Sequence, residues 1–511
     1  MHDDITTIHA IFLNTAQCLA IRFRIDFSGS SNFAIADEKL LAASSHLLFV
    51  LPATRPDQLP FSAALDAKLK RTSKKYSDLS KSALVVDLPG GAVASWVVLA
   101  EGLTTFNRQT SLRKAIKPLL DEKPKALTIA VYGSDDERKV AAKDAFYVAS
   151  VNAAELPARK GKSSQKDEAP VALETIAIVG WQEADGFAQI SAIVAGSILA
   201  RSLTMTPPNE LNPTQYRNKI NELSKLNGWQ YQEFDMKKLT QMGAGAFVAV
   251  GQGSDPLDAA IVHLTYTPKK AEKHIALVGK GICFDTGGHN LKPAKYMSGM
   301  HEDMNGSAVA LGVLLAASQA ELPMKIDCWL AIAQNHIGPL AYKQNDVVTA
   351  LNGTTIEIVH TDAEGRMVLA DTLTLASREK PDWMIDFATL TGSMVSALGD
   401  RYSGVLGNTP ALLCKAVGVG AAVGERVCAF PFDEDYDEDI ESSIADVKQC
   451  TLEGGADHVH ATRFLAKFIE NDIPWIHVDL SSSNRKGGLG GVGSDVNGFG
   501  VALTFELMKQ Y

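Results

Sequence analysis

The stretch HIALVGKGICFD, residues 274–285, opens with a short apolar run and ends at an aspartate. Four further short apolar runs follow it: IDCWLAIA (326–333), TIEIVH (355–360), WMIDFATL (383–390) and WIHVDL (475–480). Helix-favouring segments such as GSAVALGVLLAASQA (306–320) lie between the runs. Buried strands that alternate with helices form sheets covered on both faces, so the pattern predicts an α/β fold with a mixed, largely parallel central sheet flanked by helices.

The composition changes at ARKGKSSQKDEAP (158–170), which is polar, charged and without apolar periodicity. Before it, ASWVVLAEG (94–102) and ALTIAVYG (126–133) resemble strands among amphipathic helices. A chain of 511 residues is too long for a single core, so more than one domain is expected. We predict a smaller N-terminal α/β domain over 1–157, a linker over 158–172 and a larger domain over 173–511.

The charge is unevenly distributed along the chain, whose net charge is −10. Residues 1–170 hold 23 Lys and Arg against 19 Asp and Glu, whereas the remainder holds 26 against 40. The acidic second part disfavours non-specific binding of nucleic acid and suits a region that hosts cations.

Several features bear on where the protein works. The six cysteines are scattered and form no CxxC pair, which favours a reducing compartment and argues against a thiolate zinc site. Asp3 and Asp4 stand where a signal peptide carries positive charge, and no apolar run approaches the ~18 residues that span a bilayer. We therefore expect a cytoplasmic protein that does not enter the membrane.

Each common catalytic motif is incomplete, misplaced or missing in this sequence. GKGICF (279–284) ends in phenylalanine where GxGxxG needs glycine, and GLGGVG (488–493) lies too near the C-terminus for a nucleotide-binding unit. HEDMN (301–305) begins like HExxH but has asparagine at the second ligand position, and neither GxxxxGK[ST] nor GxSxG occurs. Kinase, P-loop and serine-hydrolase functions therefore lack support.

Five polar residues near the expected strand ends remain as candidate metal ligands: Lys280, Asp285, Asp303, Asp362 and Glu364. Divalent cations accept carboxylate oxygens, and zinc also accepts nitrogen. Four buried carboxylates without cations would repel one another, whereas two divalent ions balance them if Lys280 coordinates as a neutral amine. Taken singly, each aspartate also fits a turn or helix cap, and a lone lysine also fits a solvated surface.

The two segments that carry these residues resemble the cytosol (leucine) aminopeptidase family of dinuclear metallopeptidases. The resemblance is in GKGICFDTGGHNLKP (279–293) and HTDAEGRMVLADTL (360–373). It extends to TPPNELNPTQY (206–216), GAGAFVAVGQGS (243–254) and DFATLTGSMVSALGDRYSGVLGN (386–408). It implies that the larger domain is catalytic and that the chain removes N-terminal residues from peptides.

The resemblance also implies a role for each matched residue. The five candidates fall on metal-ligand positions for two ions, zinc or manganese, with magnesium or cobalt as alternatives. Lys292 and Arg366 fall on the two catalytic positions, in which a metal-bridging water attacks the scissile carbonyl. Lys292 would stabilise the oxyanion, and Arg366 would bind a bicarbonate that acts as general base. From the sequence alone, Arg366 could also simply pair with Glu364 or another nearby carboxylate.

Further implications concern substrate and assembly. Four residues fall where the family contacts the substrate, although ordinary core packing would also explain them: Met300, Thr389, Leu390 and Gly392. The implied partners are peptides with a free N-terminus and five further copies of the chain in a homohexamer.

Some positions depart from the family pattern. His360 stands where asparagine is usual, and either a strand-end residue or a group that tunes the metal ligands would explain it. Asn305 and Ser307 replace small residues, and His458 and His460 lie close to expected substrate contacts. These changes leave the metal ligands intact.

Two other functions compete with catalysis. Family members can also bind DNA, and the basic stretch KLKRTSKKYSDLSK (68–81) is the feature that favours such a role; a solvated helix face is the alternative. An inactive scaffold would have no need of four clustered carboxylates.

The acidic run FDEDYDEDIES (432–442) is expected to begin an exposed helix.

Overall fold

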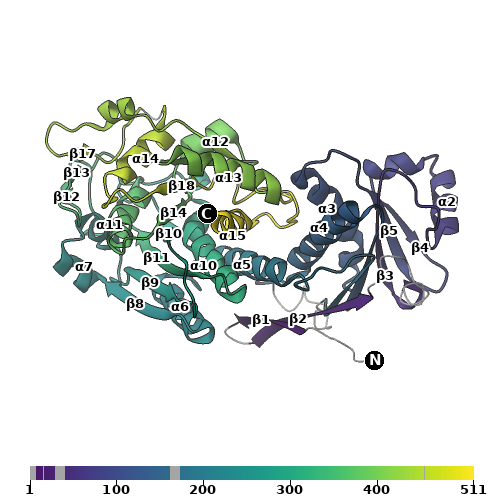
Figure 1. The fold of residues 1–511 in the computed structure, drawn as a ribbon. Coiled ribbons are helices and arrows are strands. Elements are labelled where there is room, and N and C mark those ends of the chain that lie inside the picture. The colour runs from purple at the N-terminus through teal and green to yellow at the C-terminus, as the bar shows by residue number, and fades with distance from the viewer. Residues whose placement is uncertain (1–6, 15–16, 29–40, 161–172, 454) are drawn as a thin grey trace. The chain divides into compact units, whose positions relative to one another are not determined.

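The computed structural model describes residues 7–14, 17–28, 41–160, 173–453 and 455–511 (Figure 1). Contacts divide the chain into two compact units. Unit 1 comprises residues 1–195 together with 421–424 and 486–497, and unit 2 comprises the remainder.

Unit 1 is built on a seven-stranded sheet that is parallel except at its two edges. Across the sheet the strands are β1 (Thr7–Asn14), β2 (Gln17–Ser28), β7 (Thr175–Val179), β6 (Ala126–Val131), β3 (His46–Leu51), β5 (Val93–Val98) and β4 (Leu84–Asp87). Its helices are α2 (Ser62–Arg71), the 3-10 helix η1 (Tyr76–Ser80), α3 (Thr105–Asp121), α4 (Asp135–Ala153) and the first half of α5 (Ala188–Thr204).

The central strand β3 shows why helices cover both faces of this sheet. Leu48 and Val50 pack among apolar residues of α3 and α4. Their neighbours Leu47 and Phe49 point to the opposite face, where they pack with α2 and η1. Successive strand residues alternate between faces, so a continuous apolar run fits a strand that is buried on both sides.

The boundary between the units differs from the predicted one. Residues 173–195 belong to unit 1, because β7 pairs with both β2 and β6. The larger unit therefore begins at Gly196 rather than at residue 173. Of the expected linker, 158–160 has no regular structure, and 161–172 lies outside the described residues.

Unit 2 contains an eight-stranded mixed sheet, as predicted, with helices on its faces. In order across the sheet, the strands are β16 (Val427–Ala429), β15 (Ser403–Gly407), β18 (Trp475–Asp479), β14 (Trp383–Ala388), β10 (Lys273–Asp285), β11 (Met324–Asn335), β9 (Ala260–Tyr266) and β8 (Gln230–Asp235). The four neighbours β18, β14, β10 and β11 run parallel.

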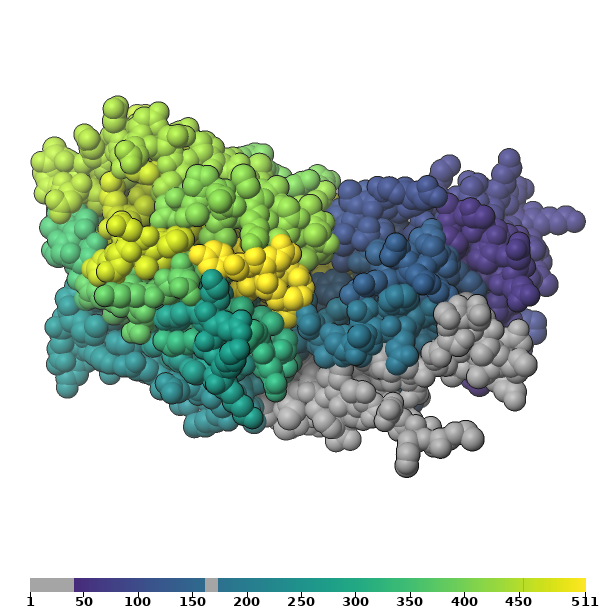
Figure 2. Space-filling view, in the orientation of Figure 1, coloured from purple at the N-terminus to yellow at the C-terminus, as the bar shows by residue number. Residues whose placement is uncertain are grey.

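Most remaining elements of unit 2 are helices. They are α6 (Pro213–Asn227), α7 (Met236–Met242), α8 (Gly245–Gly251), α9 (Ala294–Met297), η3 (Met300–Met304), α10 (Asn305–Gln319), α11 (Glu364–Arg378), α12 (Gly392–Leu398), α13 (Pro410–Val423), η4 (Glu434–Ile440), α14 (Asp457–Ala466) and α15 (Val501–Gln510). Nearly every residue of α10 and α11 is buried, and both helices pack against β10. The yellow C-terminal part of the chain reaches the surface in Figure 2.

Two expectations for unit 2 need correction. The run TIEIVH does not join the central sheet; its first residues form β13 (Thr355–Glu357), which pairs with β12 (Val347–Thr349) and β17 (Val447–Lys448) in a separate sheet. The acidic run 432–442 forms the 3-10 helix η4 rather than the start of an α-helix.

The basic stretch noted in the sequence forms regular surface elements of unit 1. The basic stretch 68–81 ends α2 and forms η1, with Leu69 and Leu79 buried and Lys70 and Lys75 exposed. Within the described residues, no helix combines the length and apolar character needed to cross a membrane.

Candidate metal and active site

Strand β10 carries two of the predicted ligands, Lys280 and Asp285. Ala276 and Val278 pack with α11 on one face of the strand, and Lys280 continues this alternation. Lys280 lies within the strand rather than after it, because β10 runs on to Asp285, where it pairs with Asn335 of β11.

Glycine next to Lys280 allows the other face of β10 to meet a helix. A β-carbon at Gly279 would lie 2.5 Å from the Cα of Ser307 in α10, which is closer than two carbon atoms can approach. The close packing brings the start of α10, with Asp303 just before it in η3, to the end of the strand.

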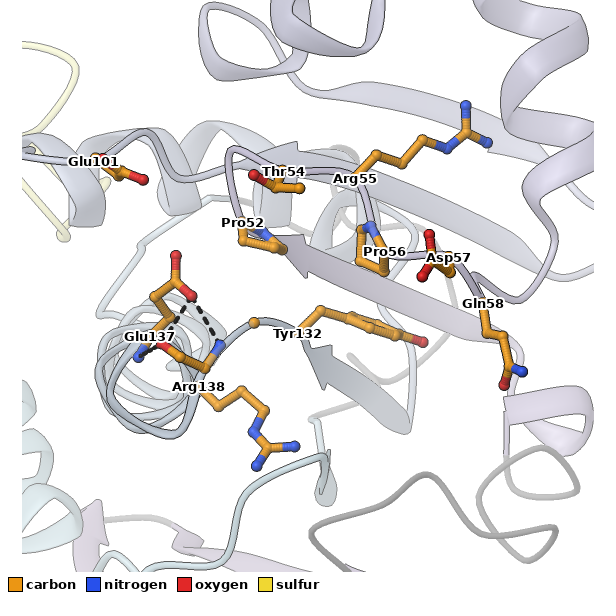
Figure 3. Close-up of a pocket in the computed structure, with 12 residues that line it drawn as sticks. Pro52, Thr54, Arg55, Pro56, Asp57, Gln58, Glu101, Tyr132, Glu137 and Arg138 are labelled. Atoms are coloured by element: carbon orange, nitrogen blue, oxygen red, sulfur yellow. Dashed lines mark hydrogen bonds between the residues drawn. The ribbon is translucent and has the colours of Figure 1, made fainter.

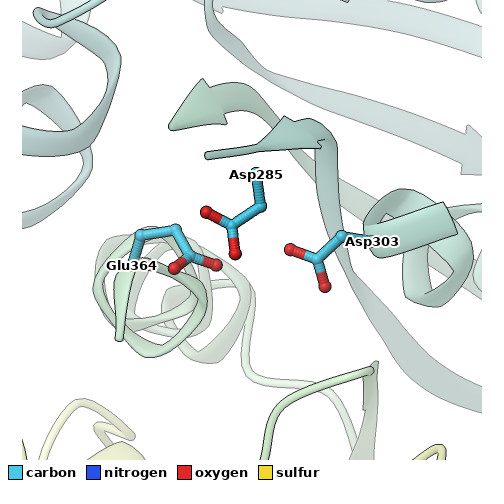
Figure 4. Close-up of side chains that lie close together, drawn as sticks. All are labelled: Asp285, Asp303 and Glu364. Atoms are coloured by element: carbon cyan, nitrogen blue, oxygen red, sulfur yellow. The ribbon is translucent and has the colours of Figure 1, made fainter. Parts of the chain in front are cut away.

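Three carboxylates from distant parts of the sequence converge here. Asp285 ends β10, Asp303 belongs to η3, and Glu364 is the first residue of α11. One oxygen of each lies within 4.8 Å of the others, and all three residues are buried (Figure 4). Among the described residues, no other group of His, Cys, Asp or Glu meets this criterion.

Lys280 lies among these carboxylates. Its Nζ is 2.8 Å from Oδ1 of Asp303 and 3.0 Å from Oε1 of Glu364, and it also donates to the carbonyl oxygen of Thr389 at 3.1 Å. Thr389 Oγ1 donates in turn to Asp303 at 2.7 Å. The amine is therefore held by one acceptor from each of three segments.

A second lysine connects Asp362 to the cluster. Nζ of Lys292 lies 2.9 Å from Oδ2 of Asp285 and 2.5 Å from Oδ1 of Asp362. Lys292 is partly exposed, unlike Lys280. Four carboxylates and two lysines thus form one charged network.

Asn335, which was not predicted, supports the cluster from the end of β11. Its Nδ2 donates to Asp285 at 2.9 Å and to the carbonyl oxygen of Thr361 at 3.0 Å. The hydroxyl of Tyr342 donates to the same carbonyl at 2.7 Å. Asn335 closes the apolar run of β11, so the reasoning that selected Asp285 at a strand end also applies to it.

Burial is the largest effect on the pKa of the buried aspartates, whereas the surrounding carboxylates outweigh burial at Lys280. Burial raises the pKa of Asp285 to about 7 and that of Asp303 to about 8, with further upward effects from neighbouring carboxylates. Burial alone would lower the pKa of Lys280, but Asp303 and Glu364 together raise it. Burial thus favours the neutral, protonated form of Asp285 and Asp303, whereas Lys280 stays charged.

The donor set fits divalent cations. Oδ2 of Asp303 is buried and has no hydrogen-bond partner, although a carboxylate oxygen removed from water is costly without one. It belongs to the group whose oxygens converge within 4.8 Å. Oxygen ligands converging around an unsatisfied carboxylate are the chemistry that divalent ions require.

Arg366 is held by protein groups. It is 2% exposed, and its Nη2 donates to both carboxylate oxygens of Asp457 at 2.9 and 3.0 Å. Its Nη1 donates to the carbonyl oxygen of Gln449 at 3.0 Å. Asp457 was not predicted; it lies in a segment noted only for its histidines, and no sequence spacing links it to Arg366.

The four predicted substrate contacts differ in position. Thr389 adjoins Asp303 and Lys280, as described above. The backbone N–H of Leu390 donates to Asp479 at 3.1 Å, and its side chain packs against the core. Gly392 begins α12 and is exposed, and Met300 begins η3 and is half-buried.

The departures from the family pattern have local partners. Nδ1 of His360 accepts from the backbone N–H of Asp362 at 3.2 Å, and burial lowers the pKa of this histidine. His458 lies 3.0 Å from the hydroxyl of Ser393, and His460 pairs with Asp439.

Asn305 and Ser307 form hydrogen bonds within the core. Asn305 donates to Thr204 at 3.0 Å, and the hydroxyl of Ser307 lies 2.9 Å from that of Tyr216. These two departures are therefore accounted for by packing.

A separate polar cavity of about 700 Å³ lies in unit 1 (Figure 3). It is lined by residues that follow β3, β5 and β6 and by the start of α4. Three of its charged groups have partners: Arg55 pairs with Asp66, Arg138 pairs with Asp135, and Glu137 caps α4 through Ser134. None of the predicted site residues lies there.

Comparison with known proteins agrees with the geometry. The model of the catalytic domain of the cytosol aminopeptidase family matches residues 198–505, which include every residue of the cluster. This family is metal-dependent.

Individual relatives carry corresponding names. A probable cytosol aminopeptidase of Corynebacterium glutamicum is 37% identical over 69% of this chain and 70% of its own. One of Stutzerimonas stutzeri is 42% identical over 58% of this chain and 59% of its own. A solved structure of the bottromycin maturation enzyme BotP in complex with Mn is 27% identical, with a TM-score of 0.79, and the match covers 91% of this chain and 99% of that one.

Proposed function

The chain belongs to the cytosol aminopeptidase family, and we propose on this premise that it removes the N-terminal residue from peptides at the carboxylate cluster of unit 2. The chain is thus a hydrolase of the aminopeptidase class. The observation that carries the proposal is the convergence of Asp285, Asp303 and Glu364 around Lys280.

The residues that would hold two divalent ions are Lys280, Asp285, Asp303, Asp362 and Glu364. Zinc or manganese is the expected metal, and a solved relative contains Mn. When bound, such ions lower the pKa of a water, polarise the peptide carbonyl and stabilise negative charge on its oxygen. The chain's contribution is to hold these ligands in place through the strand end, η3 and α11.

Lys292 is suited to stabilise an oxyanion. An ammonium group has three donors, and two of them face Asp285 and Asp362. The third is available to a developing negative charge on the substrate. The two carboxylates raise the pKa of Lys292 despite its burial, and so keep it charged and able to donate.

Bicarbonate, which the resemblance implies as a general base on Arg366, does not fit this arginine as it stands. Both oxygens of Asp457 already lie on Nη2, and Nη1 is engaged by Gln449. Nε is the buried donor without a partner among the described residues, and an anion on it would lie against the charge of Asp457. No step is therefore assigned to bicarbonate.

The similar proteins also bear on the location and assembly of the chain. A cytosolic location agrees with their name and with the unpaired state of the five described cysteines. The resemblance further suggests a homohexamer, which the molar mass in solution would test. We do not propose DNA binding, because the basic stretch 68–81 is explained as a solvated surface.

The test uses two glutamates at opposite ends of α11. Glu364→Gln should lower the bound divalent metal and the rate of Leu-p-nitroanilide hydrolysis together, because it removes a ligand from the cluster. Glu379→Gln changes an exposed residue after the last turn and should change neither. Metal content by elemental analysis and initial rates are the measurements. A Glu364→Gln variant that keeps both, or a metal-free enzyme with an undiminished rate, would contradict the proposal.

A further inference from the structure

The arginine at the predicted catalytic position carries an anion that belongs to the chain itself. Arg366 is the third residue of α11, two positions after Glu364, and Asp457 is the first residue of α14. A guanidinium group recognises planar anions with two oxygens, a description that covers bicarbonate and a carboxylate alike. Asp457 therefore presents to Arg366 the chemical group that a free anion would present.

Groups of the chain hold both terminal nitrogens of Arg366, and only its Nε, which is buried, has no hydrogen-bond partner in the described part of the chain. Nη2 is 2.9 and 3.0 Å from the two oxygens of Asp457, and Nη1 is 3.0 Å from the carbonyl oxygen of Gln449. The guanidinium group is almost wholly buried, whereas the side chain of Asp457 keeps 24% of its exposure. A bicarbonate at the same position would have to displace Asp457 or lie against its negative charge, and like charges at such distances are strongly unfavourable in a buried site.

We propose that Asp457 replaces the free anion on Arg366, so that this enzyme neither requires nor binds bicarbonate there. Asp457 is a positioning residue, which acts by holding the guanidinium group and balancing its charge beside the metal ligands. The proposal deepens the proposed function and rests on it for its kinetic test, whereas binding of the anion can be measured independently of turnover.

The chain offers a matched control on the same helix. Asp437 also pairs through both carboxylate oxygens with an arginine, Arg463 of α14, at 2.7 Å to Nε and 2.9 Å to Nη2, and it lies 3.0 Å from Nζ of Lys467. Asp437→Ala thus removes the same type of ion pair without touching Arg366. Any general effect of bicarbonate on a newly unpaired arginine would appear in this variant too.

The kinetic test measures hydrolysis of Leu-p-nitroanilide by the metal-loaded protein in carbon-dioxide-free buffer, with and without added bicarbonate. The wild type should be indifferent to bicarbonate. Asp457→Ala should lose about tenfold or more in rate, a typical loss when a supporting partner is removed, and should recover when bicarbonate fills the space. Asp457→Asn keeps the size but not the charge, so it should lose rate without recovering. Asp437→Ala should behave like the wild type.

The binding test uses the melting temperature, because an anion that binds only the folded state raises it. Bicarbonate should raise the melting temperature of Asp457→Ala and leave that of the wild type and of Asp437→Ala unchanged. A wild-type protein that is activated or stabilised by bicarbonate would overturn the proposal, and this measurement requires no variant to fold. An Asp457→Ala variant that folds but is neither slowed nor stabilised by bicarbonate would overturn it as well. Absence of hydrolysis by the wild type would instead count against the proposed function, while the melting temperatures still decide whether Asp457 excludes the anion.

Discussion

Close packing of α11 against Lys280 gives the most specific prediction, which concerns Gly365→Ala. Gly365 is the second residue of α11, between the predicted ligand Glu364 and Arg366, at the predicted catalytic position. A β-carbon there would lie 2.6 Å from Cε and 2.7 Å from Nζ of Lys280. The lysine cannot simply retreat, because it is 3% exposed and its amine is held by Asp303, Glu364 and Thr389.

The expected magnitude follows from two opposing effects. Alanine in a helix interior is ordinarily about 0.5–1 kcal/mol more stable than glycine. Forcing a methyl group into a filled site costs about 1–3 kcal/mol, and ordinary contact here needs Lys280 to shift by roughly 0.8 Å. A shift of that size breaks its contacts of 2.8 and 3.0 Å with Asp303 and Glu364. We expect a net loss of about 1–2 kcal/mol of stability and a metal affinity lower by about 10–100-fold.

Chemical unfolding of the metal-free protein and calorimetric titration with Mn²⁺ measure these two quantities. The control is Gly418→Ala in α13, where glycine is exposed and an added β-carbon meets nothing within 4 Å. That variant should gain about 0.5–1 kcal/mol from helix propensity and bind metal normally. If Gly365→Ala were as stable as the control and bound metal equally well, Lys280 would not be fixed as described.

Three further predictions concern stability. Asp386→Ala should cost about 3–5 kcal/mol in denaturant unfolding, because Asp386 accepts from Nε1 of Trp475 and pairs with buried His477, both at 2.7 Å, and a refolded variant of wild-type stability would contradict this. Burial raises the pKa of Glu425 from 4.5 to about 7, so folding takes up a proton between these pH values, and the free energy of unfolding falls as pH rises across them. Over this range the wild type should lose up to about 3 kcal/mol relative to Glu425→Gln, and parallel pH profiles of the two proteins would exclude this. Removing divalent ions with a chelator should lower the melting temperature of the wild type, and adding Mn²⁺ should restore it in proportion to occupancy, whereas an unchanged melting temperature would argue against a metal site.

The sequence predicts the elements of unit 2 better than their assembly. The apolar runs that became β10, β11, β14 and β18 were found because strands buried on both faces are continuously apolar. The run beginning at Thr355 looks similar but forms a three-residue strand in another sheet. Likewise β7 follows the polar stretch 158–170 and yet pairs within unit 1, so strand pairing overrides the change in composition.

Some residues of the candidate site could likewise be expected from the sequence, and others could not. Asp285 could be placed at the carboxyl edge of the sheet beforehand because it ends a strand of the parallel part. Asp303 and Glu364 could be grouped with it only through the family resemblance, since β13, the strand before Glu364, lies in a separate sheet. The partner of Arg366 could not, since Asp457 comes from a helix 91 residues further on and reaches the arginine only through tertiary packing. Local pattern identifies single residues at strand ends, whereas a contact between distant elements requires coordinates.

The two lysines explain how so acidic a cluster can fold before it meets a cation. Four carboxylates close together would repel one another, but Lys280 lies between Asp303 and Glu364, and Lys292 lies between Asp285 and Asp362. Each amine pairs with two carboxylates and so offsets part of their mutual repulsion. When all four carboxyl groups are ionised, the two lysines balance only half of their charge, and the remainder attracts cations. Asp457 balances charge in the same way. The positive charge of Arg366, so close to the predicted ligands, would repel cations, and the carboxylate of Asp457 on its Nη2 reduces this repulsion.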